Sequence, residues 1–316
     1  MPRNTEHEHS SSLEHLALFY HGSEQFTQSV RTFVEDGLTA GESTLVAVPT
    51  GNLEALRAAL GGAADRIRFE DMTGVGRNPS RILALIEDWR DRHPGRARFV
   101  GEPAWSDRSD AELVESARHE ALINIALGSS RMTVLCPYDA DHLPDETLNC
   151  AERTHPLIAS PGGGRCPSAR YSDQDALFDA GEWPLQPPRG RVAQLSFTDD
   201  LHALRKFVHS ARPAEGLAPD RRADLAFALS EAAANVIKHG RSRGTVKLWR
   251  DRSAVVGEVT GPGSTIERTA GRRRPAPDAR SGRGLWLINQ VCDLVQLRAT
   301  TASTTVRVHV NAQLAC

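Results

Sequence analysis

The chain has 316 residues, of which 40% are hydrophobic and 25% are charged, and its formal net charge is −2. This balance excludes a disordered or fibrous chain and is typical of a globular protein with two ordinary domains. The charge gives no reason to expect direct nucleic-acid binding, and no apolar run approaches the roughly 20 residues of a membrane span. The five cysteines include no CxxC pair, so we expect reduced thiols in a cytoplasmic protein rather than disulfides or a zinc site.

The first part of the chain alternates strand and helix patterns. Residues 1–13 are polar and lack the basic start and apolar stretch of a signal peptide, so we expect a disordered leader. Between residues 14 and 158, the expected strands lie near residues 15–20, 43–48, 66–71, 97–101 and 132–136, and the expected helices near 23–36, 52–60, 79–92 and 109–127. Continuous apolar strands that alternate with helices predict an α/β domain with a doubly wound parallel sheet.

The second part follows a segment rich in Gly and Pro. Residues 159–189 include SPGGGRCP and EWPLQPPRG, which predict a linker with at most a short helix near residues 173–180. Between residues 190 and 316, the expected strands lie near 191–197, 244–250, 254–260, 294–300 and 304–310, and the expected helices near 199–210, 219–239 and 284–292. Strands and helices that occur in blocks predict an α+β two-layer sandwich.

One helix of the second domain carries a row of polar side chains. In LSEAAANVIKHG, Glu231, Asn235 and His239 are spaced i, i+4 and i+8, with Lys238 beside them. Such a row either points into solvent or lines a site. An amide oxygen is a suitable ligand for a Mg²⁺ that bridges phosphates, and a carboxylate one turn earlier is placed to orient or deprotonate a hydroxyl.

Glycines gather near the start of the next helix. Gly282 and Gly284, with Arg283 between them, open a helix whose free amide groups can face a phosphate, and we expect Glu231 and Asn235 to lie across from that helix start. Between the two helices, GPG follows a strand and precedes a segment with many arginines. That segment is either a solvated loop or a lid whose arginines grip phosphates or an acidic partner.

Taken in order, these motifs resemble a known family. E-x-x-x-N on a helix, G-P-G after a strand and G-x-G-L at a helix start resemble the Bergerat (GHKL) ATP-binding fold of gyrase, histidine kinases and MutL, over residues 190–311. The form EAAANVIKHG resembles the anti-sigma-factor serine/threonine kinases. The resemblance implies that Asn235 holds Mg²⁺ of bound ATP and that Glu231 is the catalytic base. It also implies a nucleotide pocket formed by Asn235, Lys238, His239, Gly261, Gly263, Gly282, Arg283, Gly284 and Leu285.

The same resemblance implies partners and leaves alternatives. The partners would be a sigma factor, a STAS-domain anti-anti-sigma protein, or both, and the chain would form a homodimer. Val259 stands where the family has the aspartate that receives the adenine amino group, so a non-catalytic partner-binding module with a degenerate nucleotide site stays open. An atypical sensor histidine kinase, phosphorylated on His202 or His209, is the third alternative.

The first domain offers polar residues at one edge of its expected sheet. Parallel sheets bind ligands at the carboxyl ends of their strands, and the chain lacks the glycine-rich loop of a P-loop NTPase. A pocket there would suit a small molecule or a redox signal. The candidate residues that follow the strands are His21, Glu70, Glu102, Cys136 and Tyr138.

This domain also resembles a family, the MEDS (DcmR-type) sensory domain. The matching pieces are HLALFYHGSEQF, GEPAW, ARHEALINIAL, VLCPYDADHLP and RTHPLI, within residues 14–158. The resemblance implies a ligand-sensing role with an unknown small-molecule ligand. Glu120 and Asn124 either brace the pocket or form a pair on the helix surface, and His21 with Cys136 is a candidate pair of metal or haem ligands. The whole chain is thus expected to be a bacterial signalling regulator of transcription in a stress response.

Overall fold

The computed structural model describes residues 13–178, 183–238, 243–279 and 282–312. These residues form two compact units. Unit 1 contains Met1–Thr73, Ile86–Arg108 and Glu120–Gln174, and unit 2 contains Gly74–Leu85, Ser109–His119 and Asp175–Cys316.

Unit 1 contains a seven-stranded sheet in the order β3-β2-β4-β5-β1-β6-β7. All neighbouring strands are parallel except the last pair, because β7 runs antiparallel to β6. The strands are β1 (Glu14–Tyr20), β2 (Ser43–Val48), β3 (Arg68–Asp71), β4 (Ala97–Gly101), β5 (Met132–Asp139), β6 (Leu157–Ala159) and β7 (Arg165–Pro167). The five predicted parallel strands are confirmed, and β7 lies inside the segment that the sequence predicted as a linker.

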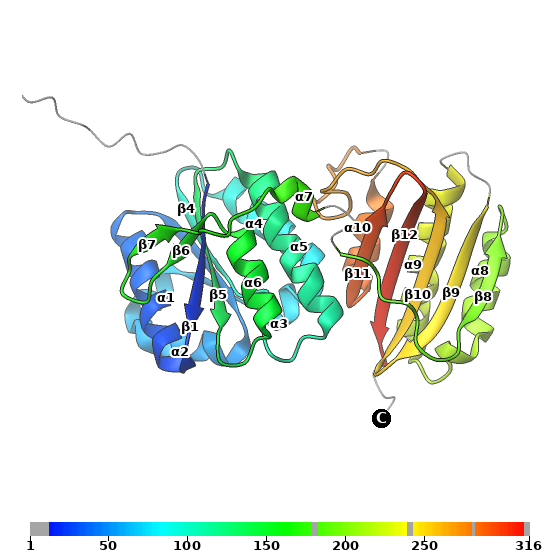
Figure 1. Ribbon diagram of the computed structural model, residues 1–316, viewed down its shortest axis with the longest axis horizontal. Coiled ribbons are helices and arrows are strands. Elements are labelled where there is room, and N and C mark those ends of the chain that lie inside the picture. Colours follow the sequence, from blue (N-terminus) through cyan, green and yellow to red (C-terminus); the bar gives the residue numbers. More distant parts are fainter. Residues whose placement is uncertain (1–12, 179–182, 239–242, 280–281, 313–316) are drawn as a thin grey trace, which may run out of the picture. The chain divides into compact units, whose positions relative to one another are not determined.

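Helices lie on both sides of this sheet, with α1 and α2 on one side and α6 on the other (Figure 1). Leu16, Leu18 and Tyr20 of β1 pack in the same apolar cluster as residues of α1 and α2, so alternation directs His15 and Ala17 to the opposite face. The helices of this stretch of the chain are α1 (Gly22–Thr39), α2 (Thr50–Leu60), α3 (Met72–Val75), α4 (Ile82–Arg92), α5 (Asp110–Leu127), α6 (Asp145–Thr154) and α7 (Gln174–Phe178), with 3₁₀ turns η1 (Gly61–Arg66) and η2 (Pro79–Arg81).

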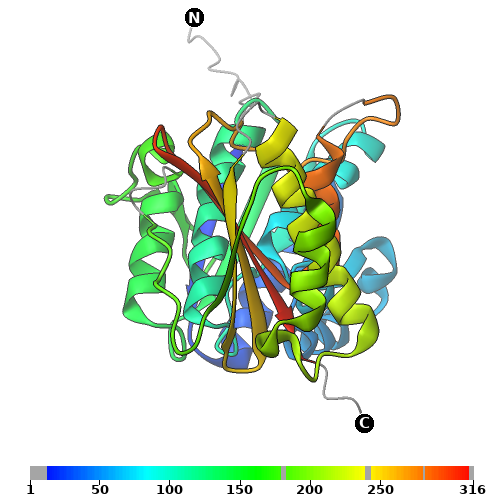
Figure 2. The same cartoon turned by 90° about the vertical axis from the view of Figure 1, so that its right-hand side faces the viewer.

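Unit 2 contains a five-stranded antiparallel sheet in the order β11-β12-β10-β9-β8. Its strands are β8 (Ala193–Phe197), β9 (Gly244–Asp251), β10 (Ala254–Pro262), β11 (Leu294–Ala299) and β12 (Ser303–Asn311). The helices are α8 (Leu201–Ser210), α9 (Pro219–Lys238) and α10 (Arg283–Val291), with the 3₁₀ turn η3 (Arg212–Ala214). Helices α8 and α9 lie on one face of the sheet (Figure 2). The predicted layer of helices against strands is confirmed.

Local sequence explains where these helices begin and which side they bury. Helix α8 begins after Asp200, whose carboxylate accepts a hydrogen bond from the Ala203 amide and so caps the helix. Leu204 and Val208, four residues apart, bury the same side of α8 in the apolar core of unit 2. Gly282 precedes α10 with φ of 85°, a left-handed conformation that a glycine adopts without strain.

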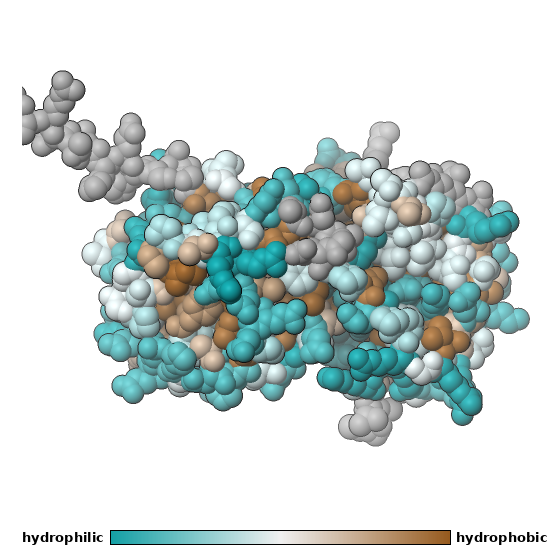
Figure 3. Space-filling model, viewed as in Figure 1, coloured by the Kyte–Doolittle hydropathy of each residue, from teal (hydrophilic) through white to brown (hydrophobic). Residues whose placement is uncertain are grey.

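The polar surface and the absence of a long apolar helix among the described residues agree with a chain that is 40% hydrophobic and 25% charged. On the face shown in Figure 3, hydrophilic residues prevail and apolar residues occur in small separate patches. In the part of the chain that the structure describes, no helix is both long and apolar enough to cross a bilayer.

Candidate functional site

A cavity of about 480 Å³ lies in unit 2 at the end of α9, beside β10 and the start of α10. This volume falls within the range of pockets that hold small molecules. Of the residues that the sequence singled out, the cavity is lined by Asn235, Lys238, Val259, Gly282, Gly284 and Leu285. Residues that the sequence did not single out complete the wall, among them Ser264, Thr265, Glu267 and Thr304.

The polar row of α9 lies directly against the start of α10. A Cβ atom placed on Gly284 would lie 2.9 Å from Glu231 Oε2 and 3.6 Å from Asn235 Nδ2. Any larger residue at position 284 would therefore displace the Glu231 carboxylate. Asn235 and Gly284 line the cavity, whereas Glu231 lies against Gly284 and is not among the lining residues, so an acid, an amide and backbone N–H groups come together beside the cavity.

The other glycines of the predicted pocket have separate structural reasons. A Cβ on Gly261 would lie 2.7 Å from Val236 Cγ1, so the glycine lets β10 approach α9. A Cβ on Gly263 would lie 2.2 Å from Thr301 O, where the chain after β10 touches the turn between β11 and β12. Both contacts lie near the cavity and fix the position of its wall.

Strand β10 presents an apolar side chain to the cavity. Val259 lines the cavity and is 1% exposed. The neighbouring Glu258 is directed to the opposite face of the sheet, where its Oε2 accepts hydrogen bonds from Arg307 at 2.6 and 2.9 Å. Lys247 Nζ lies 3.8 Å from the other Glu258 oxygen. Glu258 therefore cannot supply the cavity with the carboxylate that is missing at position 259.

The remaining residues of the predicted site lie at its margin or outside the described chain. Lys238 is exposed at the end of α9, and Leu285 packs against the apolar core of unit 2. Arg283 is exposed, and its guanidinium donates a hydrogen bond to the Pro277 carbonyl at 2.5 Å. His239 falls among residues 239–242, which lie outside the described residues.

Two arginines of the segment after β10 are held by carboxylates of unit 2. Arg268 Nη1 lies 2.8 Å from Asp175 Oδ1, and the buried Arg272 lies 3.2 Å from Glu115 Oε2. This part of the segment is therefore anchored to the protein. His202 and His209, the candidate phosphoacceptors, are both exposed on α8.

The five pocket candidates of unit 1 fall into separate surroundings. His21 is exposed, and its Nδ1 lies 2.7 Å from Asp141 Oδ1, whereas Glu70 accepts a hydrogen bond from Arg68. Cys136 and Tyr138 are buried side chains of β5. The partners of Cys136 are His15 and Glu120, so the suggested pairing of Cys136 with His21 is not what the structure shows.

Glu102 is the candidate whose surroundings shift its pKa to near neutral. It is 1% exposed, and it accepts hydrogen bonds from the Tyr20 hydroxyl at 2.7 Å and from Asn52 Nδ2 at 2.8 Å. Burial, only partly offset by these two hydrogen bonds, raises the pKa of Glu102 to about 7. The carboxyl group therefore changes charge near neutral pH.

We expect Glu102 to make the stability of the protein depend on pH. Because the folded-state pKa of about 7 exceeds the ordinary glutamate pKa of 4.5, this contribution to stability is fully present below the unfolded-state pKa and is lost as pH rises through about 7. Between about pH 5 and pH 8, the unfolding free energy of the wild type should fall by up to about 3 kcal/mol more than that of Glu102→Gln. Urea unfolding of both proteins across this pH range measures the difference, and parallel pH profiles would contradict it.

A second cavity, in unit 1, lies away from the predicted edge of the sheet. Its volume is about 910 Å³, and it lies beside α1 and the turn between β6 and β7. Glu14, Glu42, Arg96, Arg98 and Thr133, at or next to the amino ends of β1, β2, β4 and β5, line it. The residues that the sequence predicts for a ligand pocket follow the carboxyl ends of the strands, at the other edge of the sheet.

Comparisons with known proteins match two separate stretches of the chain. Residues 14–156 match the family model of the MEDS (MEthanogen/methylotroph, DcmR Sensory) domain, and residues 196–310 match that of the histidine kinase-like ATPase domain. No curated protein matches the chain. One similar solved structure is the crystal structure of the RsbU and RsbW domains of a Mycobacterium tuberculosis protein, at 14% identity and a TM-score of 0.30.

That match spans 39% of this chain and 32% of the solved chain. The two family matches confirm both resemblances that the sequence motifs indicated. The chain therefore joins a sensory segment of the MEDS type to a segment of the histidine kinase-like ATPase type.

Proposed function

We propose that the protein is a signalling regulator whose unit 2 binds Mg-ATP and acts as an anti-sigma-type serine/threonine kinase. In this proposal ATP occupies the cavity of unit 2, Asn235 holds its Mg²⁺, and Glu231 orients or deprotonates the hydroxyl of a Ser or Thr on a STAS-domain partner. The same unit would bind a sigma factor, and phosphorylation of the STAS-domain partner would leave the sigma factor captured.

The observation that carries the proposal is the contact of the α9 row with the start of α10. Glu231 Oε2 and Asn235 Nδ2 lie within reach of Gly284 at the edge of a cavity large enough for a nucleotide base. Backbone N–H groups at a helix start favour phosphate, and an amide oxygen suits Mg²⁺. The match of residues 196–310 to a histidine kinase-like ATPase domain supports the same ligand.

Unit 1 would supply the input signal. Its match to a sensory domain and its cavity of about 910 Å³, lined by both acidic and basic residues, favour a polar small molecule as the signal. A ligand that regulates the output must change the affinity of unit 2 for its partner.

A second candidate function is a partner-binding module without catalysis, and Val259 favours it. A buried valine on the cavity wall supplies no hydrogen-bond acceptor for adenine. In that case nucleotide would have no effect on partner capture.

We expect calorimetric titration of the full chain with Mg-ATP to show saturable binding that Asn235→Ala weakens by about tenfold, the loss of roughly one strong polar contact. Asn235 is half-buried, so the variant is expected to fold. His202→Ala on the exposed face of α8 is the matched control, with unchanged affinity.

Equal affinities of the wild type and Asn235→Ala would refute the assigned role of Asn235. No binding by the wild type at millimolar Mg-ATP would favour the partner-binding module instead.

A further inference from the structure

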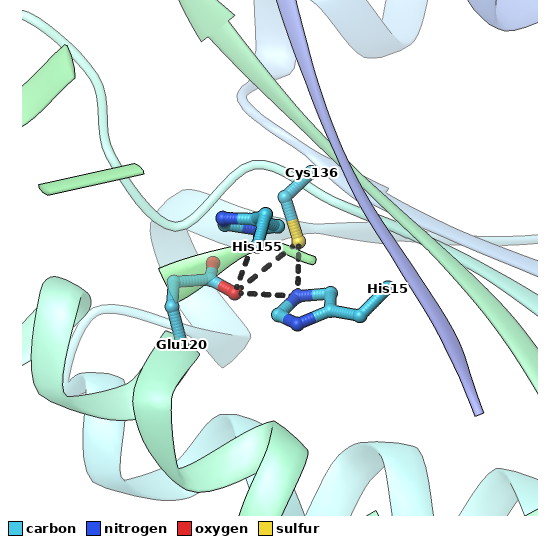
Figure 4. Close-up of side chains that lie close together, drawn as sticks. All are labelled: His15, Glu120, Cys136 and His155. Atoms are coloured by element: carbon cyan, nitrogen blue, oxygen red, sulfur yellow. Dashed lines mark hydrogen bonds and ion pairs between the residues drawn. The ribbon is translucent and has the colours of Figure 1, made fainter. Parts of the chain in front are cut away.

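Four side chains with metal-ligating atoms converge inside unit 1 (Figure 4). They are His15 of β1, Glu120 of α5, Cys136 of β5 and His155, which follows α6. All four are buried, and their ligand atoms lie within 4.8 Å of one another. We call them the buried cluster.

The hydrogen bonds around His15 fix which of its nitrogens carries the proton. Asn124 Nδ2 donates to the carbonyl oxygens of Thr154, at 2.7 Å, and of Glu120, at 3.2 Å. The amide oxygen of Asn124 is therefore the atom that lies 3.0 Å from His15 Nδ1, and Nδ1 must donate to it. In the neutral ring this leaves a lone pair on His15 Nε2, which lies 3.0 Å from Glu120 Oε2.

The same reasoning applies to His155. Its Nδ1 lies 2.8 Å from the Ala151 carbonyl oxygen, which only accepts, so Nδ1 carries a proton. His155 Nε2 lies 3.4 Å from Glu120 Oε2, and among the described residues neither His155 Nε2 nor Glu120 Oε1 has a hydrogen-bond partner. Two imidazole lone pairs and a carboxylate therefore face one another in the interior with too few protons between them.

Protonation of both histidines is unfavourable in this arrangement. The rings of His15 and His155 lie 4.0 Å apart, so two imidazolium ions would repel each other. A metal cation coordinated by the two imidazole nitrogens and the carboxylate satisfies these buried groups at a lower free-energy cost.

We propose that His15 Nε2, Glu120 Oε2, Cys136 Sγ and His155 Nε2 form a tetrahedral site for a divalent transition metal, with Zn²⁺ as the fitting ion. Imidazole nitrogen, thiolate sulfur and carboxylate oxygen are the ligands that Zn²⁺ takes in proteins. The Asn124 and Ala151 oxygens orient the two rings, as outer partners of metal-bound histidines do.

Four of the six distances between the ligand atoms are close to those of a tetrahedral site, and all six lie within 4.8 Å. Bond lengths of about 2.0–2.3 Å place neighbouring ligand atoms of tetrahedral Zn²⁺ roughly 3.3–3.6 Å apart. The distances from Glu120 Oε2 to His15 Nε2, Cys136 Sγ and His155 Nε2 are 3.0, 3.3 and 3.4 Å, and Cys136 Sγ lies 3.5 Å from His15 Nε2. Four protein ligands in the interior describe a closed site with a structural role.

The charges also balance. Zn²⁺ with one carboxylate and one thiolate is neutral, which favours burial. Binding would displace the Cys136 thiol proton to solvent, and the sulfur would bond the metal in its place. Four separate elements of unit 1 would then be joined at one point.

The test is titration of the purified, chelator-treated full chain with Co²⁺, which replaces Zn²⁺ in tetrahedral sites and absorbs light. The wild type should bind one Co²⁺ per chain, with the intense visible bands of tetrahedral cobalt and a near-ultraviolet band from thiolate-to-metal charge transfer. Zn²⁺ should displace it and abolish both. Cys136→Ser should lose the charge-transfer band and bind at least tenfold more weakly.

Cys150→Ser is the matched control, because Cys150 is also a buried cysteine but lies outside the cluster, and the spectrum of this variant should equal that of the wild type. The proposal fails if the wild type binds no Co²⁺ at micromolar concentration, or if the bound Co²⁺ lacks the charge-transfer band. It also fails if the band persists in Cys136→Ser, which would place the thiolate elsewhere. The wild-type titration decides the question even if Cys136→Ser is unfolded by circular dichroism.

Discussion

Replacing Val259 with aspartate should tighten Mg-ATP binding about 10- to 100-fold. The reason is that Val259 is on the cavity wall at the position where the resembling family places an adenine-binding carboxylate. A charge-assisted hydrogen bond contributes roughly 1.5–3 kcal/mol, which converts to that range of affinity. Calorimetric titration of the full chain with Mg-ATP, wild type against Val259→Asp, measures the change.

The same substitution should lower stability without nucleotide, because position 259 is 1% exposed and an unpaired carboxylate is costly there. Mg-ATP should therefore raise the melting temperature of Val259→Asp more than that of the wild type. Val259→Asn is the matched variant: its neutral amide has a similar size, so its gain in affinity should be smaller. An affinity of Val259→Asp equal to or below that of the wild type would show that adenine does not lie against β10.

Replacing Arg307 with methionine should destabilise the protein by about 3–5 kcal/mol, the usual result of removing one partner from a buried ion pair. Arg307 and Glu258 face each other on β12 and β10, and both are 6% exposed. Arg307 also donates to the Gln186 carbonyl and lies over the Trp249 ring. Without Arg307, the remaining charged partner of the Glu258 carboxylate within the described residues is Lys247, at 3.8 Å. Urea unfolding of the two proteins measures the loss.

The double variant Arg307→Met with Glu258→Leu separates the lost charge pair from lost packing. Removing both charges leaves no unpaired carboxylate, so the double variant should recover most of the stability that Arg307→Met loses. If the double variant is as unstable as the single one, the packing of Arg307 against Trp249 is the larger contribution.

The fold of both units was predictable because their patterns are local. Continuous apolar strands such as β2 predict a buried parallel sheet, and a three-residue strand such as β7 is too short to give a periodic signal. The spacing of Glu231 and Asn235 placed them on one side of α9, and alternation in β10 placed Glu258 opposite Val259. These inferences needed only the geometry of one helix or one strand.

The buried cluster was not predictable in the same way. Its four residues come from elements far apart in the sequence, and no short spacing motif joins them. The sequence predicted Cys136 as a candidate metal ligand, but with His21 as its partner, because both were expected at the carboxyl end of a strand. The available signal was His15, a polar residue directly before the apolar run of β1, which alternation directs away from Leu16.

The place of β1 in its sheet constrains how the chain acquires its structure during synthesis. β1 leaves the ribosome long before its two neighbours in the sheet, β5 and β6, in which Leu135 and Leu157 lie opposite Leu16. The apolar residues of β1 have neither neighbouring strand to pair with until most of unit 1 has been translated. Pairings between strands so distant in sequence form slowly. A nascent chain that ends before Met132 lacks both neighbours of β1, so it exposes an unpaired apolar strand and is a natural substrate for chaperones.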